Sequence, residues 1–331
     1  MPLPITKGQF NRLGDRLIAG ESPSQADLDE LETVLTAYQA VLEQVKAHLR
    51  DLGFAPGDRV KTTPTMLDKL RRIPGMELSR VQDLAGARIT VRNLAAQDEA
   101  AKKISEFYAA QGCPWREVNR RTDPRFGYRA VHLVVSIEAI PVEIQIRTEL
   151  QNSWAQIVER LADRWGRGIR YGENPENPEG IVRSGQSVDS RRGFLTTLMT
   201  LSDLIWTVEQ SRRALDSSQE LLRGLDSIWD GILRLTEPNP SLLASKISPT
   251  MALSPGTMAV LNARAEALDA EAREALDAGA NMTVAQMRRL TEIAIGFVKD
   301  DASVVSVRVA EEEQQLRDML KSVADATDEG E

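Results

Sequence analysis

Polar and apolar side chains alternate between residues 141 and 147. Glu143, Gln145 and Arg147 occupy every second position of this stretch, and valine and isoleucine fill the positions between them. Successive side chains of a β-strand point to opposite faces, so the three polar groups should share one face. A carboxylate, an amide and a guanidinium in one row on a rigid surface are suited to bind a polar, charged substrate.

The segment before this row carries a second set of polar groups. Tyr128, Ala130 and His132 fall on one face of a strand, and a hairpin would bring them beside the row that contains Glu143. The resulting surface would hold an aromatic ring, an imidazole, a carboxylate and a guanidinium, which resembles the floor of a binding site. The alternative is an ordinary solvated face, since antiparallel sheets commonly have one.

A second carboxylate precedes the strand that begins near residue 88. Asp83 and Arg88 flank Gly86, whose backbone freedom would let the chain turn so that both side chains reach one pocket. Asp83 and Glu143 would together supply the carboxylates with which proteins commonly bind Mg²⁺, while substrate phosphates complete the shell. The alternative for Asp83 is a helix cap or a turn former.

Five cationic residues lie within the fourteen positions 59–72. Arg59 and Lys61 precede a helix that we expect to begin after Pro64, with the Thr65 hydroxyl in its first turn and Lys69 one turn further. Free N–H groups at a helix N-terminus together with nearby cations form a cradle for phosphate. The alternative is an exposed basic helix.

Charge is distributed unevenly over the 331 residues. Residues 50–175 contain 21 Lys and Arg against 16 Asp and Glu, whereas the whole chain has a net charge of −8. Seventeen of these 21 cations are arginine, the side chain best suited to bidentate phosphate contacts, so we expect an anionic substrate. A basic surface without a ligand would show the same bias.

Composition excludes several classes of site. Cys113 is the only cysteine, and His48 and His132 are the only histidines, so a disulfide framework, a cysteine-rich zinc site and a multi-histidine metal hydrolase are excluded. No apolar run approaches the length of a membrane span and no signal peptide is evident, which predicts a cytoplasmic protein that does not contact membranes.

Hydrophobic periodicity predicts the elements that must position these residues. Residues 24–50 form an amphipathic helix, 88–92, 115–119, 130–137 and 141–147 form strands, and 96–111 and 148–165 form helices. The predicted fold is α/β (α+β), a small mixed and largely antiparallel sheet flanked by helices, followed by an all-helical C-terminal region. The expected domains are an N-terminal segment 1–24, a catalytic domain 25–170, a linker 171–190 and an acidic helical region 191–331.

Four ordered motifs resemble the synthetase domain of the RelA/SpoT alarmone family, in the form found in small and toxic alarmone synthetases. They are Arg59-Val-Lys61 with Thr65 and Lys69, then 83–88, then 127–132, then 142–148. The resemblance implies a nucleotidyltransferase-like domain that transfers the β,γ-diphosphate of ATP to a 3′-hydroxyl, with Mg²⁺ as cofactor.

The resemblance also implies roles for the matching residues. Arg59 and Arg88 would sandwich adenine, and Lys61, Thr65 and Lys69 would lie near the ATP phosphates. Asp83 and Glu143 would hold the metal, while Glu143 also deprotonates the acceptor and Gln145 supports it. The acceptor side would consist of Tyr128 stacked on its base, and of Arg129, His132 and Arg147 at its phosphates. Arg125 stands near the position of a lysine that the family usually has.

Three functions remain open at this stage. The first is a synthetase that makes guanosine or adenosine 3′-diphosphate alarmones from GDP, GTP or an adenosine nucleotide. The second is a toxin that places the diphosphate on the 3′ end of tRNA, and the third is an inactive nucleotide-binding or RNA-binding regulator. The C-terminal helices could neutralise the catalytic domain, form a homo-oligomer, or bind a partner such as an antitoxin.

Overall fold

The computed structural model describes residues 3–20, 22–60, 66–67, 70–71, 75–81, 84–184, 187–236, 255–278 and 284–328. The chain forms two compact units, of which the first contains residues 1–209 and 315–331 and the second contains residues 210–314. Each unit is described separately below.

The elements of the first unit between residues 85 and 165 follow the predicted alternation of helices and strands. Its helices are α1 (Lys7–Ile18), α2 (Gln25–Asp51), η1 (Leu78–Arg80), α4 (Leu94–Ala110), α5 (Glu149–Trp165) and η2 (Arg167–Tyr171). Its strands are β1 (Gly57–Val60), β2 (Ala85–Val91), β3 (Trp115–Asn119), β4 (Val131–Ile137), β5 (Ile140–Thr148), β6 (Ile181–Ser184) and β7 (Ser187–Ser190). Of these elements, α1, β1, β6 and β7 were not predicted. The helices α6 (Arg191–Thr236) and α10 (Val284–Asp328) contribute residues to both units.

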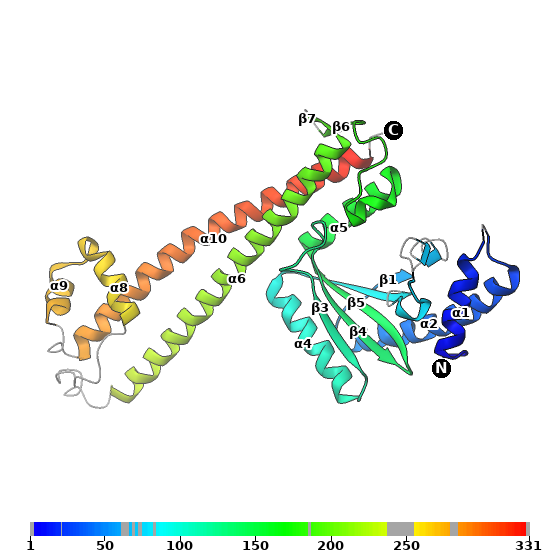
Figure 1. Ribbon diagram of the computed structural model, residues 1–331. Coiled ribbons are helices and arrows are strands. Elements are labelled where there is room, and N and C mark those ends of the chain that lie inside the picture. The colour runs from blue at the N-terminus through cyan, green and yellow to red at the C-terminus, as the bar shows by residue number, and fades with distance from the viewer. Residues whose placement is uncertain are drawn as a thin grey trace. The chain divides into compact units, whose positions relative to one another are not determined.

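The main sheet has five strands in the order β1-β2-β5-β4-β3 (Figure 1). The pair β2 and β5 is parallel, and the other three pairs are antiparallel. A parallel pair needs a crossover connection, which here contains α4, β3 and β4. The prediction of a mixed, largely antiparallel sheet flanked by helices is confirmed.

A tight hairpin fixes the register at the centre of the sheet. Glu138 and Ala139 connect β4 to β5, and both have positive φ angles, 49° and 66°, as a two-residue turn of type I′ requires. This turn pairs His132 with Gln145 and Leu133 with Ile144. The polar residues predicted to face one side of the sheet therefore do so, and the aliphatic residues face the other side.

The aliphatic face of the sheet is covered by α2 and α4, and α1 packs against α2 and joins the same hydrophobic core (Figure 1). Val142, Ile144 and Ile146 have no exposed surface there, and they share one hydrophobic core with the apolar stripe of α2. Ser24 caps α2 by accepting a hydrogen bond from the backbone N–H of Asp27. The predicted amphipathic helix 24–50 is therefore present and packs against the sheet.

Removing side-chain volume from this core should destabilise the protein strongly. We expect Ile144→Ala to lower the free energy of unfolding by about 2–5 kcal/mol, because the fully buried side chain leaves a cavity. Ile181→Ala is the matched control, since Ile181 is 71% exposed and its loss should change the value by less than about 0.5 kcal/mol. Chemical denaturation measures both, and equal losses would contradict this packing.

A second hydrophobic core joins α5, the start of α6 and the end of α10. It includes Trp154 and Leu161 of α5, Leu198 and Leu201 of α6, and Leu316 of α10. All of these residues belong to the first compact unit. The beginning of the C-terminal helical region is therefore part of the same packed body as the sheet.

The second unit is helical throughout its described part. Besides portions of α6 and α10 it contains α8 (Pro255–Ala263), η3 (Ala265–Ala267) and α9 (Ala270–Asp277). Leu261, Leu268 and Leu290 lie in its small core. No helix in the described part of the chain combines the length and apolarity needed to cross a bilayer.

The boundaries of the two compact units differ from the domain boundaries expected from the sequence. The expected boundaries lie at residues 170 and 191, whereas the units divide within α6 and within α10. The segment 171–190 holds the end of η2 and the β6–β7 hairpin, and the segment 1–24 holds α1. The all-helical character of the described residues 191–328 agrees with the prediction.

Candidate active site

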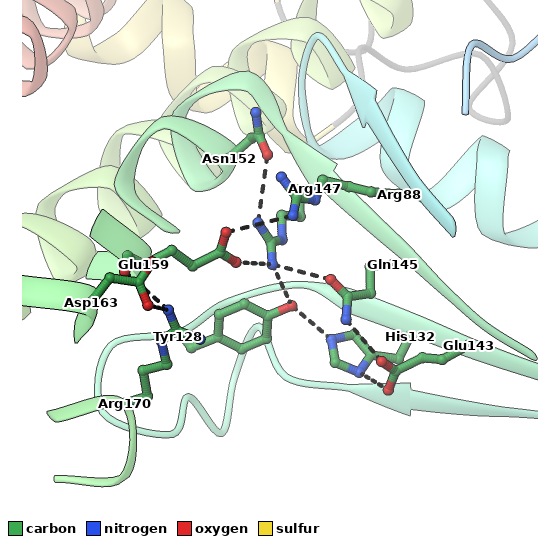
Figure 2. A network of polar contacts seen from close by, with 10 residues as sticks. All are labelled: Arg88, Tyr128, His132, Glu143, Gln145, Arg147, Asn152, Glu159, Asp163 and Arg170. Atoms are coloured by element: carbon green, nitrogen blue, oxygen red, sulfur yellow. Dashed lines mark hydrogen bonds and ion pairs between the residues drawn. The ribbon is translucent and has the colours of Figure 1, made fainter. Parts of the chain in front are cut away.

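A polar row crosses three adjacent strands on the face of the sheet opposite the aliphatic core. Arg88 of β2 pairs with Gln145 of β5, which pairs with His132 of β4, so the three residues share this face. Glu143 lies two residues before Gln145 on the same face. Figure 2 shows their side chains converging, with Tyr128 approaching from the segment that precedes β4.

The carboxylate of Glu143 is held at both oxygens. Its Oε1 lies 2.9 Å from His132 Nδ1, and its Oε2 accepts a hydrogen bond of 2.8 Å from Gln145 Nε2. The side chain is only 14% exposed. These contacts fix the orientation of Glu143, as an acid or base that acts on a substrate requires.

Polar contacts continue from Glu143 through His132 to Tyr128 and Arg147. Arg147 only donates, so the Tyr128 hydroxyl oxygen accepts from it at 3.2 Å. The same hydroxyl lies 2.9 Å from His132 Nε2, and which of the two donates depends on where the imidazole carries its proton. A proton on His132 Nδ1 would be donated to the carboxylate of Glu143.

Arg147 lies in the interior rather than on a solvated face. Its side chain has no exposed surface, and it donates to Tyr128 Oη and to Gln145 Oε1 at 3.1 Å. Its guanidinium also lies over the Tyr128 ring, 5.0 Å from the centroid. Arg147 therefore orients the aromatic and amide groups of the site. Because its side chain is fully buried, it does not contact a substrate phosphate in this conformation.

Two residues of α5 complete the network without having been predicted as site residues. Glu159 lies 3.5 Å from Arg147 and 3.6 Å from Arg88, and the Asn152 Oδ1 lies 3.5 Å from Arg147. They are seven positions apart, which places both on one side of α5 (Figure 2). A polar residue five positions after Arg147, followed by another seven positions later on the same side of the helix, was the sequence signal that could have identified them.

The capping of α5 explains why this helix can reach Arg147. Thr148 ends β5 and caps α5, with Gln151 completing a capping box. Such a box is readable in the sequence as threonine followed three residues later by glutamine. The strand therefore passes directly into the helix, and Glu159 is placed over the polar row.

The remaining acceptor-side residues lie in or beside a tight turn. Arg125 and Tyr128 close this turn with a backbone hydrogen bond of 3.0 Å, and Phe126 and Gly127 occupy its centre with φ of 51° and 77°. Arg125 is exposed. Arg129, in contrast, is buried and donates to Asp203 of α6 at 2.6 Å, so its guanidinium does not join the network around Glu143.

Most of the predicted ATP-binding residues lie outside the part of the chain that the structure describes. They are Lys61, Thr65, Lys69 and the side chain of Arg59, and the predicted metal ligand Asp83 also lies outside it. Arg59 lies in β1, and its backbone pairs with Gly86 of β2, two residues before Arg88. The roles assigned to these five residues remain predictions.

The described residues offer only part of a metal site. Among them, no group of three or more His, Cys, Asp or Glu side chains could hold a metal ion. Mg²⁺ commonly takes only one or two carboxylates together with substrate phosphates, so the carboxylate of Glu143 is chemically suitable as one ligand. Asp83, the other predicted ligand, lies outside the described residues.

Comparison with known proteins places this site in a recognised region. Residues 58–162 match the family model described as a region found in RelA / SpoT proteins. The chain carries a RelA/SpoT region. The match contains β2, β4, β5 and most of α5, and hence the whole polar network around Glu143.

Relatives of this chain include one with a named activity. The uncharacterized protein Rv1366 of Mycobacterium tuberculosis is 36% identical over 179 residues, covering 52% of this chain and 64% of the relative. The GTP pyrophosphokinase YjbM of Bacillus subtilis is 29% identical over 160 residues, covering 44% of this chain and 73% of the relative. The alignment thus spans less than two thirds of the mycobacterial protein.

Solved structures similar to this chain include two alarmone synthetases. Small alarmone synthetase 1 from Bacillus subtilis superimposes with a TM-score of 0.45 at 22% identity, covering 58% of this chain and 98% of the other. Small alarmone synthetase 2 from the same organism has a TM-score of 0.45 at 15% identity, with coverages of 57% and 99%.

Proposed function

We propose that this chain is a pyrophosphokinase that transfers the β,γ-diphosphate of ATP to the 3′-hydroxyl of a guanosine or adenosine nucleotide. One observation carries the proposal most directly. The RelA/SpoT region coincides with a sheet face on which His132 and Gln145 orient the carboxylate of Glu143. The relative named as a GTP pyrophosphokinase supports the same class of reaction.

Glu143 acts as the general base in this proposal. It accepts the proton of the acceptor 3′-hydroxyl while that oxygen attacks the β-phosphorus of ATP. The bond between the β-phosphorus and the α,β-bridging oxygen breaks, AMP leaves, and the acceptor carries the diphosphate. Because such transfer needs positioning and charge neutralisation more than covalent chemistry, a fixed carboxylate within an arginine-rich region suits it.

Mg²⁺ would be held by Asp83 and Glu143 and would neutralise charge on the transferred diphosphate. Arg88 and Arg59 would bind the adenine ring, and Lys61, Thr65 and Lys69 would contact the phosphates of ATP. On the acceptor side, the Tyr128 ring offers a plane on which a base can stack. His132 lies 2.9 Å from the Tyr128 hydroxyl, and the exposed Arg125 stands three residues before Tyr128, so both would meet the phosphates of the acceptor.

The transfer of label from γ-labelled ATP tests this function. The purified chain is incubated with Mg²⁺, labelled ATP and either GDP, GTP, unlabelled ATP or bulk tRNA, and the acceptor that gains label is identified. We expect a free nucleotide to be labelled. Labelling of tRNA alone would assign the toxin function instead, and labelling of none of the four would refute the proposed enzyme.

A further inference from the structure

The first part of α6 contacts the residues on both sides of Tyr128. Ser202 Oγ donates a hydrogen bond to the backbone oxygen of Gly127, and Asp203 Oδ1 accepts one of 2.6 Å from Arg129. These contacts join positions about 75 residues apart in the chain. All of the residues belong to the first compact unit.

Two further hydrogen bonds hold this stretch of α6 in place. The Trp154 indole donates to the backbone oxygen of Leu198 at 2.6 Å, and Gln151 donates to Glu209 at 2.9 Å. Both donors lie on α5, which also carries Glu159 of the polar network. The helix that contacts the Tyr128 segment is thus itself anchored to the body of the unit.

The turn that precedes Tyr128 needs external support. Phe126 has a φ of 51°, in the left-handed region that bulky residues rarely adopt and that persists only where the surroundings hold it. Gly127 follows with a φ of 77°, and a Cβ there would lie 2.7 Å from the Trp154 ring and 2.9 Å from Met199 Sδ of α6. The turn is therefore pressed directly against α5 and α6.

The guanidinium of Arg129 contacts two residues of α6, Asp203 and Trp206. Its side chain is 7% exposed, it also donates to the backbone oxygen of Arg121, and it lies 5.3 Å from the Trp206 ring centroid. A buried guanidinium needs a counter-charge, and Asp203 supplies it while remaining 70% exposed itself. Arg129 thus acts as an internal anchor for the segment and does not extend toward a ligand.

We propose that Ser202 and Asp203 are positioning residues for the acceptor side of the reaction. They fix residues 127 and 129, between which Tyr128 is presented to His132 and, through it, to Glu143. This inference rests on the proposed function, because it assigns the Tyr128 segment to the acceptor. The start of the C-terminal helical region is then required for transfer and is not an inhibitor of it.

Two variants with matched controls on the same helix test this proposal. Ser202→Ala removes the hydrogen bond to Gly127, and its control Thr200→Ala removes a hydroxyl that donates to the backbone oxygen of Thr196 in the same helix. Asp203→Asn removes the counter-charge of Arg129, and its control Asp216→Asn breaks an ion pair with Arg212 within α6. Asp203→Glu retains the charge and should restore the function.

Hydrogen exchange and steady-state kinetics are measured on the full chain. We expect Ser202→Ala and Asp203→Asn to accelerate amide exchange at residues 126–130 by at least about fivefold, with no change in the controls. The KM for whichever of GDP, GTP, ATP or tRNA the wild type labels should rise about tenfold, while the KM for donor ATP stays within about twofold. Asp203→Glu should recover most of this loss.

The two readouts separate failure of this inference from failure of the proposed function. A wild-type chain that labels none of the acceptors refutes the proposed function, and unchanged exchange at 126–130 in both variants still overturns the positioning role. If the wild type is active, the positioning role is overturned when the acceptor KM of the variants is unchanged. It is also overturned when the acceptor KM and the KM for donor ATP rise equally. If Asp203→Asn does not fold, the expectations for Ser202→Ala, which retains the ion pair, decide the matter.

Discussion

Glu143→Gln should reduce diphosphate transfer by at least about a hundredfold while leaving the affinity for ATP nearly unchanged. An amide cannot take the proton of the acceptor hydroxyl, and general-base catalysis contributes about 10²- to 10⁴-fold. The amide also has one acceptor oxygen where the carboxylate has two, so it cannot receive hydrogen bonds from His132 and Gln145 on separate oxygens.

The measurement for Glu143→Gln is the initial rate of label transfer, together with ATP affinity by calorimetry. Glu149→Gln is the matched control, because Glu149 lies six residues away at the start of α5 and pairs with Arg317 at the surface. Its rate should stay within about twofold of the wild type. A Glu143→Gln enzyme with more than about a tenth of the wild-type rate would contradict the role of general base.

Arg147→Met should lower the free energy of unfolding by about 3 kcal/mol. The guanidinium is fully buried, and its removal leaves the Tyr128 hydroxyl, the Gln145 carbonyl and Glu159 without their shared donor. Removing one partner of a buried charged pair costs about 3–5 kcal/mol, and the 30% exposure of Glu159 reduces this cost. Methionine fills much of the volume, so lost polar contacts dominate the effect.

Chemical denaturation of Arg147→Met should be compared with that of Arg80→Met. Arg80 is 71% exposed and pairs with Glu77 three residues earlier, so its replacement should cost less than about 1 kcal/mol. Arg147→Lys should also destabilise the protein, because one ammonium cannot reproduce the planar fork that reaches Tyr128 and Gln145 together. Equal stabilities of Arg147→Met and Arg80→Met would show that Arg147 is not the centre of the network.

Local patterns predicted the polar row well because strand geometry leaves little freedom. The alternation through 141–147 determined which side chains share a face, and the position of His132 one strand earlier required only a tight hairpin. The structure confirms both features and the helix that follows Thr148. These inferences depend on neighbours in sequence or on one short turn.

Long-range pairing could not be predicted in the same way. The arginine-rich composition of 50–175 indicated an anion-binding surface, yet Arg121, Arg129 and Arg147 are buried in internal contacts. Arg121 pairs with Asp98 and Arg129 with Asp203, 23 and 74 residues away. Composition reports how many cations a segment has but not which of them are used internally, since that depends on tertiary packing.

Local sequence patterns also could not predict the role of the C-terminal helices, because that role depends on long-range packing. An acidic helical region next to a basic domain suggested that these helices could neutralise the catalytic domain. In the structure, Phe194, Leu198 and Leu201 of α6 complete the core around Trp154. Truncation before α6 would expose this core, so point substitutions in α6 are the sharper test of any regulatory role.

The stoichiometry of AMP and labelled acceptor tests the central claim most directly. A wild-type reaction with γ-labelled ATP should release one AMP for each acceptor that gains label, and nuclease digestion should locate the diphosphate at the 3′ position. The Glu143→Gln enzyme should release neither product above background. Release of ADP in place of AMP, or an equal yield of labelled acceptor from Glu143→Gln, would contradict diphosphate transfer centred on Glu143.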